Sequence, residues 1–103
     1  MKWMEAIDLR TFGNRLDMLK HELRLDMLKH ELISIRTETD KRNGLKEIKL
    51  YCHASIDTDL SVHLYWEGGD ADIHGSALAL RLASALEEFG RVNHTVWIED
   101  QTK

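Results

Sequence analysis

Two neighbouring stretches of the chain alternate tyrosine and histidine in a pattern that could move protons. The first stretch carries Tyr51 and His53, and the second carries His63 and Tyr65. A neutral imidazole accepts a proton near pH 7 and a phenol donates one, so such a cluster in an apolar cavity could orient an aromatic substrate and transfer a proton. We therefore expect these four side chains to line a ligand cavity.

Two further aromatic residues extend this set, one beside the second stretch and one near the end of the chain. The ligand-cavity candidates are then Tyr51, His53, His63, Tyr65, Trp66 and His94. The competing interpretation is that these side chains only fill an interface, where tyrosine is common. No serine and no cysteine stands in a recognised nucleophile motif, so the sequence assigns no catalytic residue.

Six histidines suggest a metal site, but their spacing argues against one. His21 and His30 are nine residues apart on a predicted helix, and therefore lie on opposite faces of it. His53 and His63 could approach each other across two strands, but no third ligand is apparent. We expect no metal and no other cofactor, and the single Cys52 excludes an internal disulfide.

Two predicted strands hold the tyrosine and histidine residues. Lys46–Ala54 and Leu60–Glu67 alternate apolar and polar side chains, and the short segment between them suits an antiparallel hairpin. If the hairpin turns near Asp57, Tyr51 lies opposite His63. The other two candidates of these strands then lie nearby on the same face.

The remaining elements follow from periodicity and from capping residues. A helix is predicted from Phe12 towards Thr39, ending at the polar segment 39–44, although Ile33–Thr39 also suits a short strand. A second helix begins after Ser76 and ends by Gly90. Its expected apolar stripe is Leu78, Leu82, Ala85, Leu86 and Phe89, flanked by Ala79 and Ala83. The first and last strands of the chain are predicted at Lys2–Arg10 and Arg91–Glu99.

This order of elements predicts an α+β ferredoxin-like βαββαβ fold over residues 1–103 as a single domain. Its antiparallel sheet would have both helices on one face. The other face would carry tryptophan, tyrosine, histidine and aliphatic residues, and an apolar face of that size is usually buried by a partner. We therefore expect a homodimer or a higher homo-oligomer.

The predicted first helix contains an exact tandem repeat, because Arg15–Leu23 recurs without change as Arg24–Leu32. Nine residues at about 100° each place the apolar stripe of the second copy opposite that of the first. Either one copy loops out, or the helix runs on and a partner covers the surplus stripe. We expect an elongated helix, because extension keeps every backbone hydrogen bond.

Composition excludes several classes of protein. The net charge of −4 comes from interspersed signs, so no basic surface for nucleic acid is predicted. No apolar run is long enough to span a membrane, and residues 1–10 lack the pattern of a signal peptide. The expected location is the cytoplasm.

Three segments carry a resemblance to a known family: LSVHLYWE at 60–67, GSALAL at 75–80 and FGRVNHTVWI at 89–98. They resemble the antibiotic biosynthesis monooxygenase-like members of the dimeric α/β barrel superfamily. The resemblance implies that two ferredoxin-like sheets pack face to face, and many members bind or oxidise small organic molecules without metal or flavin.

Two functions are consistent with these patterns. The first is a small-molecule-binding protein resembling cofactor-independent monooxygenases, with an unknown substrate. The second is a non-catalytic binding or self-assembly module, in which the repeated segment is a natural or engineered insertion. A cavity of a few hundred cubic ångströms with convergent polar groups would favour the first, and a filled interface would favour the second.

Overall fold

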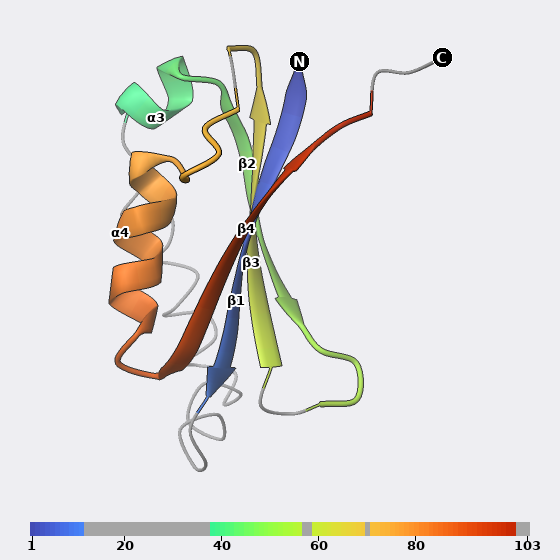
Figure 1. The fold of residues 1–103 in the computed structure, drawn as a ribbon, viewed down its shortest axis with the longest axis vertical. Coiled ribbons are helices and arrows are strands. Elements are labelled where there is room, and N and C mark those ends of the chain that lie inside the picture. The colour runs from blue at the N-terminus through green and yellow to red at the C-terminus, as the bar shows by residue number, and fades with distance from the viewer. Residues whose placement is uncertain (12–37, 57–58, 70, 101–103) are drawn as a thin grey trace.

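One four-stranded antiparallel sheet, with helices on one side, organises the part of the chain that the computed structural model describes, residues 1–11, 38–56, 59–69 and 71–100 (Figure 1). The elements are β1 (Lys2–Thr11), α3 (Glu38–Arg42), β2 (Leu45–Cys52), β3 (Asp59–Glu67), α4 (Ala77–Leu86) and β4 (Gly90–Ile98). The strand order is β2-β3-β1-β4, and every neighbouring pair is antiparallel. This is the predicted α+β ferredoxin-like fold.

The predicted long first helix, with both copies of the nine-residue repeat, lies outside the described residues. Only its expected end is described. Helix α3 spans Glu38–Arg42, so the prediction that the polar segment 39–44 is a break without helix is wrong for its first four residues. A turn at Asn43 and Gly44 follows the helix, and Gly44 has a positive φ of 105° and donates its N–H to the carbonyl of Lys41. The alternative strand at Ile33–Thr39 is contradicted at Glu38 and Thr39, which are helical.

The two faces of the sheet differ because side chains alternate along each strand. The side chains that point toward the helices form the core, which includes Trp3, Ile7, Leu9, Leu60, Val62, Leu64 and Trp66. Figure 1 shows the sheet nearly edge-on, with α3 and α4 on its left side and no described element against its right side. We call this uncovered side of the sheet the open face.

Helix α4 packs on the core through a stripe that differs slightly from the predicted one. Leu78, Leu82 and Leu86 are buried as expected, but Ala85 is exposed and Ala79 is fully buried instead. At about 100° per residue, Ala79 and Ala85 flank the leucine row on opposite sides, so the buried face of α4 extends to the Ala79 side of the row. No helix within the described residues is long and apolar enough to cross a bilayer.

Candidate functional site

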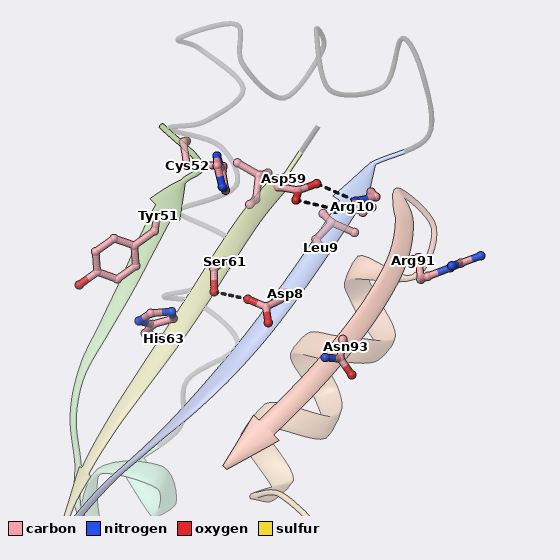
Figure 2. Close-up of a pocket in the computed structure, with 12 residues that line it drawn as sticks. Asp8, Leu9, Arg10, Tyr51, Cys52, Asp59, Ser61, His63, Arg91 and Asn93 are labelled. Atoms are coloured by element: carbon pink, nitrogen blue, oxygen red, sulfur yellow. Dashed lines mark hydrogen bonds and ion pairs between the residues drawn. The ribbon is translucent and has the colours of Figure 1, made fainter. Parts of the chain in front are cut away.

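The open face carries a groove of about 670 Å³ (Figure 2). All four strands contribute to it, because the register places their outward side chains in rows across the sheet. The lining residues are Asp8, Leu9, Arg10, Tyr51, Cys52, His53, Asp59, Leu60, Ser61, His63, Arg91 and Asn93. This volume lies within the range of small-molecule sites in proteins.

Three of the predicted residues meet at one side of this groove. The hydroxyl oxygens of Tyr51 and Tyr65 are 3.2 Å apart, and the Tyr65 hydroxyl is 3.4 Å from Nδ1 of His63. The rings of Tyr51 and His63 are in contact, with centroids 4.5 Å apart. The structure therefore brings together a tyrosine–tyrosine–histidine cluster at the edge of the groove, which Tyr51 and His63 line.

The protonation states in this cluster suit proton transfer. Partial burial lowers the pKa of His63 below its ordinary value of 6.5, and the negative charge of Asp8 opposes this only in part. His63 is therefore a neutral base at pH 7. The hydrogen bond with Tyr51, together with burial, raises the pKa of Tyr65 to about 12, so its phenol stays protonated and available as a donor.

The predicted pairing of Tyr51 with His63 is wrong by one row. Tyr51 pairs with Ser61, and His63 pairs with Lys49, because the hairpin is centred at Ile56 rather than at Asp57. A shift of one residue in the turn moves the pairing by two residues and keeps the same side chains on each face. Tyr51 still reaches His63, because diagonal neighbours across two strands lie within reach of aromatic side chains.

His53 lines the groove, but its ring is engaged in the turn. Strand β2 ends at Cys52, two residues before the predicted end. Nδ1 of His53 accepts the backbone N–H groups of Ser55 at 3.1 Å and Ile56 at 2.9 Å. An accepting Nδ1 leaves the proton of the neutral ring on Nε2. This histidine therefore stabilises the loop that closes one end of the groove.

Trp66 and His94 do not line this groove, because their side chains lie on the helix-covered face of the sheet. They surround the carboxylate of Glu5, which is completely buried. This carboxylate accepts hydrogen bonds from Trp66 Nε1 at 2.9 Å, the Ser76 backbone N–H at 2.7 Å and the Ser76 hydroxyl at 2.6 Å, and it lies 3.1 Å from His94 Nε2. The prediction of one cavity for all six residues is therefore wrong.

Glu5 also explains why α4 begins where it does. Ser76 is the N-cap residue of α4 and accepts the N–H of Ala79, while its own N–H and hydroxyl bind Glu5. A carboxylate at the start of a helix is stabilised by the helix dipole. The sequence carried one signal of this role: Glu5 interrupts an otherwise apolar face of β1, between Trp3 and Ile7.

Sequence reasoning missed the charged and polar residues of the groove. Asp8 accepts the hydroxyl of Ser61 at 2.7 Å. Both carboxylate oxygens of Asp59 accept from Arg10, at 3.0 and 3.1 Å, and this hydrogen bonding raises the pKa of Arg10. Alternation along β1 does place Asp8 and Arg10 on one face, but only the strand order shows that this face adjoins His63.

A metal site is not evident in the described part of the chain. Among those residues, no group of three or more histidine, cysteine, aspartate or glutamate side chains is arranged to hold a metal ion. His53 and His63, the pair considered from the sequence, both line the groove, but no third described side chain of these types is placed to hold a metal ion with them.

Comparison with known proteins identifies relatives by structure alone, since no family model and no curated protein matches the chain. SnoaB of Streptomyces nogalater, a cofactor-independent oxygenase, superposes with a TM-score of 0.56 at 12% identity, covering 98% of this chain and 95% of SnoaB. A protein described as an antibiotic biosynthesis monooxygenase gives 0.56 at 16% identity over all of both chains. Rv0793 of Mycobacterium tuberculosis gives 0.55 at 14% identity, covering 99% and 100%. At these identities the likeness establishes the fold.

Proposed function

We propose that this chain binds a small aromatic molecule on its open face and oxidises it with O₂, without metal or flavin. The observation that carries the proposal is the neutral base His63, hydrogen-bonded to Tyr65 at the surface of a groove large enough for such a molecule. The groove also favours ligand binding over the alternative of a purely structural interface. The fold shared with SnoaB, described as a cofactor-independent oxygenase, supports the same reaction class.

The proposed chemistry acts on a methylene group acidified by a neighbouring carbonyl and an aromatic ring. His63 takes one proton, and the resulting enolate oxygen accepts a hydrogen bond from the hydroxyl of Tyr51 or Tyr65. The enolate reduces O₂, a carbon–oxygen bond forms, and the hydroperoxide loses water. In balance, CH₂ and O₂ become C=O and H₂O, so O₂ is the oxidant and the substrate supplies the electrons.

A second copy of the chain completes the proposed site. The groove is open to solvent on a sheet face that no described element covers, whereas this chemistry benefits from excluding water. Two open faces packed against each other would enclose the groove of each copy. The proposed active form is therefore a homodimer with the substrate between the sheets.

The His63→Ala variant is expected to lose about 100-fold or more of the oxygen uptake. The probe is 2-tetralone, whose methylene between ring and carbonyl is acidic, and the measurement is O₂ consumption with an electrode. Wild-type activity should fall on the acid side with a midpoint below 6.5, because the pKa of His63 is lowered. In the same range the unfolded chain binds more protons than the folded chain, so the contribution of His63 to stability rises with pH.

The matched control is His74→Ala, which removes an exposed histidine outside the groove and should keep wild-type activity. Added imidazole should restore part of the activity of the His63 variant if the missing group is a base. No uptake by the wild type above the uncatalysed rate, or equal uptake by both variants, contradicts the proposal.

A further inference from the structure

We infer that the molecule bound in the groove is an aromatic acid, whose carboxylate lies against Arg91 and Asn93 while its ring lies against Tyr51 and His63. This inference rests on the proposed function and names its substrate class. Figure 2 shows the two ends of the groove: Tyr51 and His63 on β2 and β3, and Arg91 and Asn93 on β4, with β1 between them.

The end of the groove on β4 is positively charged, and the register of β3, β1 and β4 shows why. Asp59, Arg10 and Arg91 form one row across β3, β1 and β4. Two arginines that are direct cross-strand partners repel each other unless their charges are balanced. Arg10 is held by both oxygens of Asp59, whereas Arg91 makes no ion pair or side-chain hydrogen bond with any described residue. The row therefore has a surplus positive charge at its β4 end.

A carboxylate is the group that best matches this end of the groove. The planar guanidinium of Arg91 can donate two parallel hydrogen bonds to it, and the amide of Asn93, one row away on the same face, supplies a further donor. Asp8 lies directly beside Asn93 on β1, with its carboxylate on the hydroxyl of Ser61. Its negative charge opposes an anion in the middle of the groove, so the carboxylate is directed to the Arg91 end.

The spacing fits a bicyclic ligand. His63 and Arg91 are two strands and two rows apart, which corresponds to roughly 16 Å between their Cα atoms, and Asn93 lies in the row between them. The exposed Arg91 side chain points away from the groove in Figure 2 and turns inward in the proposed complex. The side chains at the two ends then leave about 7 to 9 Å, the length of a substituted two-ring system. An acid of this size places its reacting carbon beside His63 when its carboxylate is at Arg91.

The test compares 6-carboxy-2-tetralone with its methyl ester, which has the same shape and no charge. Isothermal titration calorimetry without oxygen should give the acid a dissociation constant about tenfold or more lower than that of the ester for the wild type. Arg91→Gln should remove this difference by weakening the acid alone. The matched control is Arg42→Gln, an exposed arginine on α3 that does not line the groove and should leave both affinities unchanged.

The outcomes separate this inference from the proposed function. Equal affinities of the acid and the ester for the wild type, or equal weakening of both by Arg91→Gln, would overturn the anion site even if 2-tetralone is oxidised. Arg91-dependent binding of the acid without any oxygen uptake would support the anion site and refute the oxidation. Weaker binding of the acid than the ester would overturn the inference, because Asp8 would then dominate the charge of the groove.

Discussion

Replacing Glu5 by glutamine is expected to lower the free energy of unfolding by about 3 kcal/mol or more. The carboxylate is fully buried, and it accepts three hydrogen bonds from Trp66 and Ser76 while contacting His94. A glutamine of the same shape would turn an NH₂ group toward at least one of these donors. The donors would then be buried without an acceptor, which costs about 1 to 3 kcal/mol for each group.

Urea unfolding of the Glu5→Gln variant measures this effect, with Glu99→Gln as the matched control. Glu99 is exposed just after β4, so its substitution should change the free energy of unfolding by less than about 0.5 kcal/mol. Near-wild-type stability of the Glu5 variant would show that the buried carboxylate does not anchor the start of α4. Ser76→Ala, which removes both the cap and one bond to Glu5, should cost about 1 to 2 kcal/mol.

The second large effect is expected at Trp97. Its ring is 59% exposed on the open face, where its Nε1 donates to the hydroxyl of Thr95 at 2.9 Å. It also lines a second groove of about 400 Å³ on the sheet, together with Met4 and Tyr65. An exposed tryptophan whose ring is fixed by a hydrogen bond is typical of the centre of a protein interface. We expect the wild-type chain to be a dimer through this face.

The Trp97→Glu variant should weaken the dimer by about 30-fold or more, so that it is a monomer at tens of micromolar by light scattering. Leu80→Glu is the matched control. Leu80 is 56% exposed on α4, on the other side of the sheet, and its substitution should leave the dimer intact. A wild-type monomer at the same concentration, or dissociation caused by Leu80→Glu instead, would contradict a dimer formed by the open face.

The parts of the fold that the sequence predicted well are those that depend on local periodicity. The alternation of β3 and the leucine spacing of α4 identify their buried faces, and Ser76 was identified as the cap of α4. The end of α3 was missed because its residues are all polar, and a polar segment followed by Gly44 looks like a loop in the sequence. Continuation of the predicted first helix through the repeat stays a prediction.

The candidate site was predicted only in part, because a residue's neighbours across a sheet depend on strand order and register. Tyr51, His63 and Tyr65 could be grouped because they lie on one hairpin. Arg91 could not be added, because nothing local shows that β4 lies beside β1 with this register. His94 was grouped wrongly, because only the register shows that it pairs with Ile7 and lies beside Glu5 on the helix-covered face.

The most direct test of the account is to observe which histidine responds when a ligand binds. Titration of 6-carboxy-2-tetralone into the protein without oxygen, followed by the Cε1–H signals of the histidines in NMR, distinguishes the two faces of the sheet. Single His→Ala variants assign the signals. If the ligand binds on the open face, the His63 signal should shift, while those of His94 and the exposed His74 stay unchanged. A shifted His94 signal with an unmoved His63 signal would place the ligand on the helix-covered face and contradict the account.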